Sequence, residues 1–250
     1  KNHLIGPKGR IIAAMLALAT FTVATPIVAD TATGDLAPVP RHEKIGQLVT
    51  EFIQKSHYRH AEVDDDLSSQ VLDRYIEALD NNRMYFLASD IAAFEQYRYL
   101  LDDMVRSEPL NPVFEMFDLY RTRVRERLEF ARTQLETEPD YTVDESYLFD
   151  REEVEWAEST DDLDELWRKR VKNDALSLAL ADKEWADTQE VLEKRYGRFA
   201  KRMDQIKADD VFETFMNALA HTLDPHSNYL SPRNSEEYRI QMSLSYFGIG

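Results

Sequence analysis

Phe117-Asp-Leu-Tyr-Arg-Thr-Arg-Val-Arg-Glu-Arg-Leu-Glu-Phe-Ala-Arg-Thr-Gln-Leu135 is the stretch of this sequence that decides the fold. Its apolar side chains recur three and four residues apart, with arginines and glutamates between them. Because an α-helix has about 3.6 residues per turn, this spacing places the apolar residues on one face. That face comprises Phe117, Tyr120, Val124, Leu128, Ala131 and Leu135. The stretch therefore predicts an amphipathic helix, which Glu138-Pro139-Asp140 ends.

The same spacing recurs on both sides of this stretch. Further helical stripes occupy residues 45–53, 71–79, 91–101, 163–171, 191–206 and 212–223. Acidic and hydroxyl residues that cap helix N-termini precede several of them, at 64–68, 89–90, 160–162 and 209–210. Residues 141–160 have no sustained period, which predicts a loop or a short helix. Glycine is scarce, at 7 of 250 residues, so a sandwich or barrel is disfavoured. We expect a mainly α fold, with an irregular multi-helix domain over residues 41–223.

The end of the sequence has a different pattern. Met242, Leu244 and Tyr246 alternate with serines, which is the period of a strand with one buried face. We therefore expect a strand over residues 242–250. Residues 224–250 would then form a joint and the first strand of a following domain.

Composition excludes several classes of protein. The sequence has 47 acidic and 30 basic residues and a formal net charge of −17, which repels nucleic acid and anionic lipid headgroups. We therefore expect no nucleic-acid partner. There is no cysteine, so disulfides, thiol nucleophiles and cysteine-based metal sites are excluded.

The first 29 residues have the three parts of a secretory signal peptide. A basic head contains Lys1, Lys8 and Arg10. An apolar run over residues 11–24 follows, and a small residue, Ala29, marks the cleavage point. The run is shorter than the ~20 residues that span a bilayer. The polar, proline-bearing linker at 30–40 favours cleavage over an uncleaved anchor or a buried helix. We expect an exported protein with no membrane span after cleavage, and no lipid anchor because no cysteine is present.

His57 and His60 are the candidate metal ligands. Imidazoles three residues apart share a helix face, and the carboxylates of Glu62 and of residues 64–66 follow closely. These acids are better explained as caps for the helix at 71–79. We therefore predict no metal site.

Asp224, His226 and Ser227 have the three residue types of a hydrolase triad. A triad needs the serine at one imidazole nitrogen and the aspartate at the other, and residues one and two positions apart rarely meet that geometry. Asp224-Pro225 is better explained as the end of a helix, with Ser227 and Asn228 making turn hydrogen bonds. A glycine-rich phosphate loop, an HExxH motif and a serine elbow are all absent from the sequence. We predict no catalytic, cofactor-binding or metal-binding residue in these 250 residues.

Three segments together resemble one protein family. Leu223-Asp-Pro-His-Ser-Asn-Tyr-Leu230 resembles the segment before the PDZ domain in tail-specific (carboxy-terminal processing) serine proteases, and Phe247-Gly-Ile-Gly250 resembles the start of that domain. Asp64-Asp-Asp-Leu-Ser68, Leu79-Asp-Asn-Asn-Arg-Met-Tyr-Phe86 and Ser89-Asp90 resemble the helical N-terminal region of the large periplasmic branch. The resemblance covers residues 41–250.

This resemblance implies a parent protein that is a periplasmic endopeptidase. Its PDZ domain would capture the apolar C-terminal tails of envelope proteins, and a Ser–Lys pair would cut them. Both the PDZ domain and that pair would lie beyond Gly250, so the chain is expected to be a fragment. The helical part would offer a docking surface for substrates and for a helical-repeat lipoprotein adaptor.

Two other hypotheses remain open from the residues. One is a stand-alone periplasmic helical binding module without catalysis. The other is a metal-dependent periplasmic protein that uses His57 and His60. The sequence after Gly250 separates the protease from the module, and metal analysis of the purified chain tests the other alternative.

Overall fold

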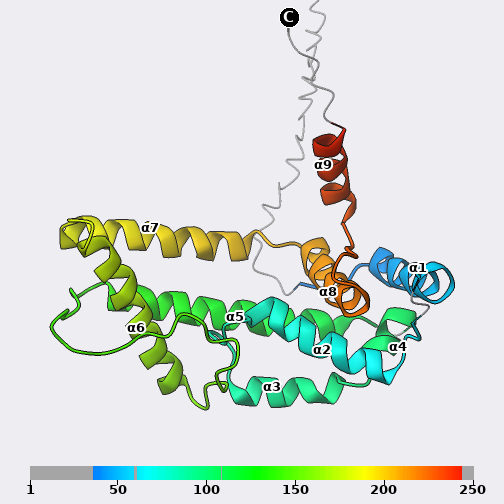
Figure 1. Cartoon of the computed structure of the whole chain (residues 1–250), viewed down its shortest axis with the longest axis horizontal. Coiled ribbons are helices and arrows are strands. Elements are labelled where there is room, and N and C mark those ends of the chain that lie inside the picture. Colours follow the sequence, from blue (N-terminus) through cyan, green and yellow to red (C-terminus); the bar gives the residue numbers. More distant parts are fainter. Residues whose placement is uncertain (1–35, 59–60, 108, 244–250) are drawn as a thin grey trace, which may run out of the picture. The chain divides into compact units, whose positions relative to one another are not determined.

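The computed structural model describes residues 36–58, 61–107 and 109–243. Within these ranges the chain forms helices joined by loops, with no strand; a single bridge joins Leu87 and Ala157 (Figure 1). The elements are α1 (Pro40–Ser56), α2 (Asp65–Asp80), α3 (Ala88–Phe94), the 3-10 turn η1 (Glu95–Tyr97), α4 (Leu101–Arg106), α5 (Asn111–Gln134), α6 (Thr160–Ala179), α7 (Trp185–Asp204), α8 (Ala208–Leu223) and α9 (Pro232–Met242). The mainly α fold is therefore confirmed.

The helix predicted from residues 117–135 is the centre of the fold. α5 packs against α6, α7 and α8, while α2 packs against α8 and α4. The predicted apolar face of α5 is buried, except that Tyr120 is half-buried. Among the described residues, the largest fully buried side chains are Trp167, Tyr75, Phe86, Phe114, Phe212 and Phe215. Each such side chain contributes about 1.5–3 kcal/mol when it leaves water, so this core dominates the stability of the domain.

Asp80 organises the turn that follows α2. Its buried carboxylate accepts hydrogen bonds from the backbone N–H groups of Met84, Tyr85 and Phe86, at 2.8, 2.8 and 2.9 Å. The turn also uses a left-handed residue, Arg83, with φ 50°. The Met84 carbonyl accepts the indole N–H of the fully buried Trp167 at 2.8 Å, which joins the turn to α6.

The apolar stripe predicted for residues 45–53 is on a helix, and Ile45, Val49 and Ile53 pack on the core as predicted, whereas Leu48 and Phe52 do not. The fully buried residues of α1 are His42, Gly46, Thr50 and Ile53. Leu48 and Phe52 are each 58% exposed. α1 packs closely on α4, since a Cβ atom at Gly46 would lie 2.9 Å from the Val105 carbonyl oxygen.

The stripe at residues 91–101 was predicted as one helix and is interrupted. The chain forms α3, the 3-10 turn and α4 in succession. The Ser68 hydroxyl donates to the Arg98 carbonyl at 2.8 Å and accepts from the Leu101 N–H at 2.9 Å. These bonds from α2 satisfy backbone groups that a continuous helix would pair internally. The apolar periodicity of residues 91–101 gives no indication of these hydrogen bonds from Ser68.

The structure contradicts the strand predicted over residues 242–250 at its first residue, Met242. Met242 is the last residue of α9, and residues 244–250 lie outside the described ranges. α9 itself was not predicted. Its signal is local, because Ser231 caps the helix, accepting the Asn234 N–H at 3.4 Å, and Pro232 occupies the first turn.

Candidate functional site

The segment Asp224–Leu230 turns the chain back after α8. α8 ends at Leu223, as Pro225 predicted, and Asp224 has extended backbone angles. The Ser227 N–H donates to the Asp224 carbonyl at 3.0 Å, and its hydroxyl donates to the Asp224 carboxylate at 3.1 Å. Asn228 bonds the His226 carbonyl at 3.4 Å and lies 2.9 Å from the His221 imidazole. The predicted turn bonds of Ser227 and Asn228 are confirmed.

After this turn the chain runs back along α8. The Tyr229 N–H donates to the side chain of Asn217 at 2.8 Å, and the Tyr229 ring meets Phe212 edge to face at 5.5 Å. Two residues later, the Ser231 N–H donates to the Glu213 carboxylate at 3.2 Å. The segment is therefore a joint that fixes where α9 begins.

The three residue types of a triad do not assemble as one. Ser227 bonds Asp224 directly, and the exposed His226 does not lie between them. A triad requires the imidazole to bridge the hydroxyl and the carboxylate. The Ser227–Asp224 bond instead closes the turn.

The candidate metal ligands are only partly described. His57 ends α1, is buried, and contacts the Tyr58 ring at 4.7 Å between centroids. His60 lies outside the described residues. Asp64 caps α2, with its carboxylate accepting from the Leu67 N–H at 3.0 Å, as predicted. Within the described ranges no group of three potential ligands comes together.

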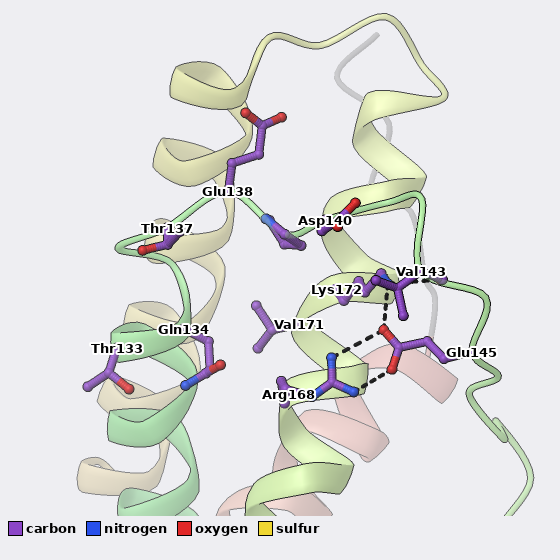
Figure 2. A pocket seen from close by; sticks show the side chains of 11 residues that line it. Thr133, Gln134, Thr137, Glu138, Asp140, Val143, Glu145, Arg168, Val171 and Lys172 are labelled. Carbon is purple, nitrogen blue, oxygen red and sulfur yellow. Dashed lines mark hydrogen bonds and ion pairs between the residues drawn. The ribbon is translucent and has the colours of Figure 1, made fainter.

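A hollow of about 440 Å³ lies beside α6 (Figure 2). The loop between α5 and α6 crosses it, and Glu145 on this loop bonds both Arg168 and Lys172 of α6. The hydrogen bonds from Arg168, and then those from Lys172, lower the pKa of Glu145 to about 2. Lys172 also donates to the Val143 carbonyl at 3.3 Å. Because Glu145 bonds both Arg168 and Lys172, this cluster holds the loop between α5 and α6 against α6.

In the part of the chain that the structure describes, no helix combines the length and apolar character needed to cross a membrane.

Two comparisons with known proteins agree on a family. The tail-specific protease N-terminal domain matches residues 49–233. The tail-specific protease of Haemophilus influenzae is 37% identical over 217 residues, which cover 85% of this chain and 31% of that protein. The chain thus spans about a third of the length of this relative. The matched region contains α2 to α8, the C-terminal part of α1 and the joint after α8. This chain belongs to the tail-specific protease family and carries its N-terminal domain.

Proposed function

We propose that this chain is the helical scaffold and docking part of an exported, periplasmic tail-specific serine endopeptidase. In this proposal the whole protein degrades envelope proteins by their apolar C-terminal tails. A PDZ domain after Gly250 captures the tail, and a Ser–Lys pair further along cuts it. The lysine takes the serine proton and the serine oxygen attacks the peptide carbonyl. The helical part docks substrates and a helical-repeat lipoprotein adaptor.

The observation that carries the proposal is the family membership of residues 49–233. The joint after α8 adds support, because it holds the chain against α8 before the chain continues into α9. Export is supported by the basic, apolar and small residues in order within residues 1–29, which lie outside the described ranges.

The test compares three proteins: the full-length gene product, this chain alone, and the full-length product lacking residues 41–223. Each is incubated with a reporter protein that ends in an apolar tail, and with the same reporter ending in a charged tail. We expect only the full-length product to cleave the apolar-tailed reporter efficiently. Cleavage by this chain alone, abolished by Ser227→Ala, would contradict the placement of catalysis downstream. Unchanged cleavage without residues 41–223 would contradict the docking role.

Export with signal cleavage is tested by a separate measurement. Mass spectrometry of the protein from the periplasmic fraction should show a mature N-terminus near Asp30. An intact segment from Lys1 to Ala29 on exported protein would contradict a cleaved signal.

A further inference from the structure

Two runs of basic residues contrast with the net charge of −17 on this chain. Residues 168–172 of α6 contain four bases, and residues 194–203 of α7 contain five, with no acidic residue in either range. Bases in an acidic chain attract the carboxylates around them. Whether each run is paired inside the fold therefore shows whether it is available to a partner.

All four bases of α6 have partners inside the fold. Three pair with carboxylates and one stacks on a ring: Arg168 with Glu145 and Glu165, Lys169 with Glu165, Lys172 with Glu145, and Arg170 over Trp167. This run therefore holds α6 to its neighbours and leaves little charge for a partner.

The bases of α7 are less fully paired. Three have one partner each: Lys194 with Glu190, Arg195 with Asp174 at 3.5 Å, and Arg202 over the Phe199 ring at 5.4 Å. Exposed ion pairs of this kind contribute only ~0–1 kcal/mol and exchange readily with other partners. Arg198 and Lys201 are exposed, and within the described ranges their side chains form no ion pair, hydrogen bond or ring contact. Their charge is available to a partner.

Arg198 and Lys201 share one face of α7 with Lys194 and Gly197. These four residues follow the spacing i, i+3, i+4, i+7, which places them in one stripe, and all four are exposed. The opposite face of α7 is buried where the helix packs on α5 and α6 (Figure 1). We call Lys194, Gly197, Arg198 and Lys201 the α7 basic face.

Gly197 has no evident role inside the fold. A glycine within a helix costs about 1 kcal/mol relative to alanine, and it is retained where the backbone needs a positive φ or a close contact. Gly197 does not have a positive φ, and a Cβ atom there would meet nothing within 4 Å. The helix dipole accounts for Lys201 in the last turn, but for neither Gly197 nor Arg198. The glycine leaves room for an external backbone to approach α7 between its bases.

The occupant that best fits this face is an acidic helix of a partner protein. Carboxylates on such a helix match the bases in charge, and its backbone can lie close to Gly197. An anionic membrane fits less well, because helices that lie on membranes insert large apolar side chains. Among the described residues, none of the exposed large apolar side chains belongs to α7. A second copy of the chain is disfavoured, because two molecules that each carry −17 repel each other.

We infer that the α7 basic face docks an acidic helix of a partner protein. The helix lies close to Gly197, and its carboxylates pair with Lys194, Arg198 and Lys201. These bases span about 10 Å along α7, or two helical turns of the partner. The inference rests on the docking role proposed above for the helical part, and it adds the face that docks and the chemistry of the partner.

The test measures fluorescence polarisation of a labelled, alanine-rich helical peptide of about 20 residues with this chain. The peptide carries its glutamates on one face, and a control peptide of the same composition carries them evenly around the helix. We expect saturable binding of the first peptide at about 50 mM NaCl and weaker binding at about 300 mM NaCl. Arg198→Glu should weaken binding roughly 10-fold or more. Lys44→Glu, which makes the same change of net charge at an exposed residue of α1, is the matched control and should leave binding nearly unchanged.

Gly197→Gln tests the close approach separately from the charge. A larger side chain at this position should weaken peptide binding several-fold by holding the two helices apart. The free energy of unfolding should stay the same or rise, because glutamine favours a helix more than glycine does and the site is open. Intact binding in Gly197→Gln, or loss of stability together with loss of binding, would overturn the role given to Gly197.

Four further results would overturn the inference. The first is absence of saturable binding, and the second is equal binding of the two peptides or equal losses in Arg198→Glu and Lys44→Glu. The third is self-association of the chain that Arg198→Glu abolishes, which would assign the face to a second copy. The fourth is binding to phosphatidylglycerol vesicles that Arg198→Glu abolishes, which would assign it to a membrane. Cleavage by the full-length protein without peptide binding would leave the proposed protease standing and reject this inference alone. Peptide binding to the α7 basic face without cleavage by the full-length protein would do the reverse.

Discussion

At the scale of single residues, His42 joins the start of α1 to the start of α8. Its Nδ1 accepts the Val39 N–H at 3.3 Å, so its Nε2 carries the proton that is donated to Asp209 at 2.8 Å. The ring lies between Phe212 and Phe114, stacked at 4.4 and 5.9 Å. One side chain thus caps one helix, bonds an acid in the first turn of another and fills part of the core.

The ionised form of Asp209 should stabilise the fold. The hydrogen bond from His42, and then that from Arg41, lower the pKa of Asp209 below its ordinary value of 3.8. A lowered pKa in the folded state adds stability above the unfolded pKa, and this stability is lost as the pH falls through the folded pKa. We expect Asp209→Asn to reduce the free energy of unfolding by about 1 kcal/mol between pH 5 and 7, a modest value because the carboxylate is partly exposed.

Urea unfolding at a series of pH values measures this effect. The difference between wild type and Asp209→Asn should shrink as the pH falls below about 4. Asp103→Asn is the control, because Asp103 pairs with Arg106 on an exposed surface at 3.3 Å. A difference between wild type and Asp209→Asn that stayed constant down to pH 2 would contradict the role of the ionised carboxylate.

Asp80 should matter more for stability than any exposed acid. Asp80→Ala leaves three buried N–H groups, those of Met84, Tyr85 and Phe86, without their acceptor. We expect a loss of about 3 kcal/mol or more in the free energy of unfolding. Asp73→Ala, which removes an exposed partner of Arg98, should lose less than about 1 kcal/mol. Equal losses in the two variants would show that the Asp80 turn contributes little.

At the scale of elements, two glycines within helices should respond to alanine in opposite directions. In α1, a Cβ at Gly46 would lie 2.9 Å from the Val105 carbonyl oxygen, so α1 and α4 would have to separate. In α7, a Cβ at Gly197 would meet nothing within 4 Å. We expect Gly46→Ala to destabilise the protein by about 1–3 kcal/mol and Gly197→Ala to stabilise it by about 0.5–1 kcal/mol. Thermal unfolding of the two variants checks the signs, and stabilisation by both would exclude a tight α1–α4 contact.

The positions of α2, α5, α6, α7 and α8 could be predicted from the sequence because their signals are local. Asp64 caps α2 and Pro225 follows the end of α8, and each acts within a few residues of the helix end. The burial of His42 and Gly46 in α1 could not be predicted, because their partners Asp209 and Val105 lie 167 and 59 positions away. The break between α3 and α4 depends in the same way on Ser68 of another helix.

At the scale of the whole molecule, the parts of the candidate site that depend on local sequence could be predicted, and the parts that depend on distant residues could not. The turn at Asp224–Ser227 could be predicted, since proline and short polar side chains determine it. The bonds from Arg168 and Lys172 to Glu145 could not, because these residues lie 23 and 27 positions from Glu145 in the sequence and meet it only in the folded chain. The chain returns along α8 because Asn217 and Glu213 accept hydrogen bonds from Tyr229 and Ser231. The apolar periodicity of α8 does not predict these contacts.

The direction in which the chain leaves the helical domain should depend on Glu213. α9 buries no residue of its own and stands apart from the other helices (Figure 1). Its start is held by Glu213, which accepts from Ser231 at 3.2 Å and from the Asn234 side chain at 2.7 Å, and by the exposed pair of Arg233 with Asp210 at 3.0 Å. We expect Glu213→Ala to release α9 while the global free energy of unfolding falls by no more than about 1–2 kcal/mol.

Hydrogen exchange of residues 229–242 gives the measurement. Their amides should exchange several-fold faster in Glu213→Ala, while those of α5 and α8 keep their protection, because local opening leaves the core intact. Glu236→Ala is the matched control, since Glu236 is exposed on α9 and lies 3.9 Å from Arg239. If the proposed function holds, Glu213→Ala should also reduce cleavage of tailed substrates by the full-length protein more than Glu236→Ala does, because the domains that we propose after α9 would lose their fixed starting point. Unchanged exchange in α9 would show that Glu213 does not hold the helix, and faster exchange with unchanged cleavage would show that a fixed exit is not needed for activity.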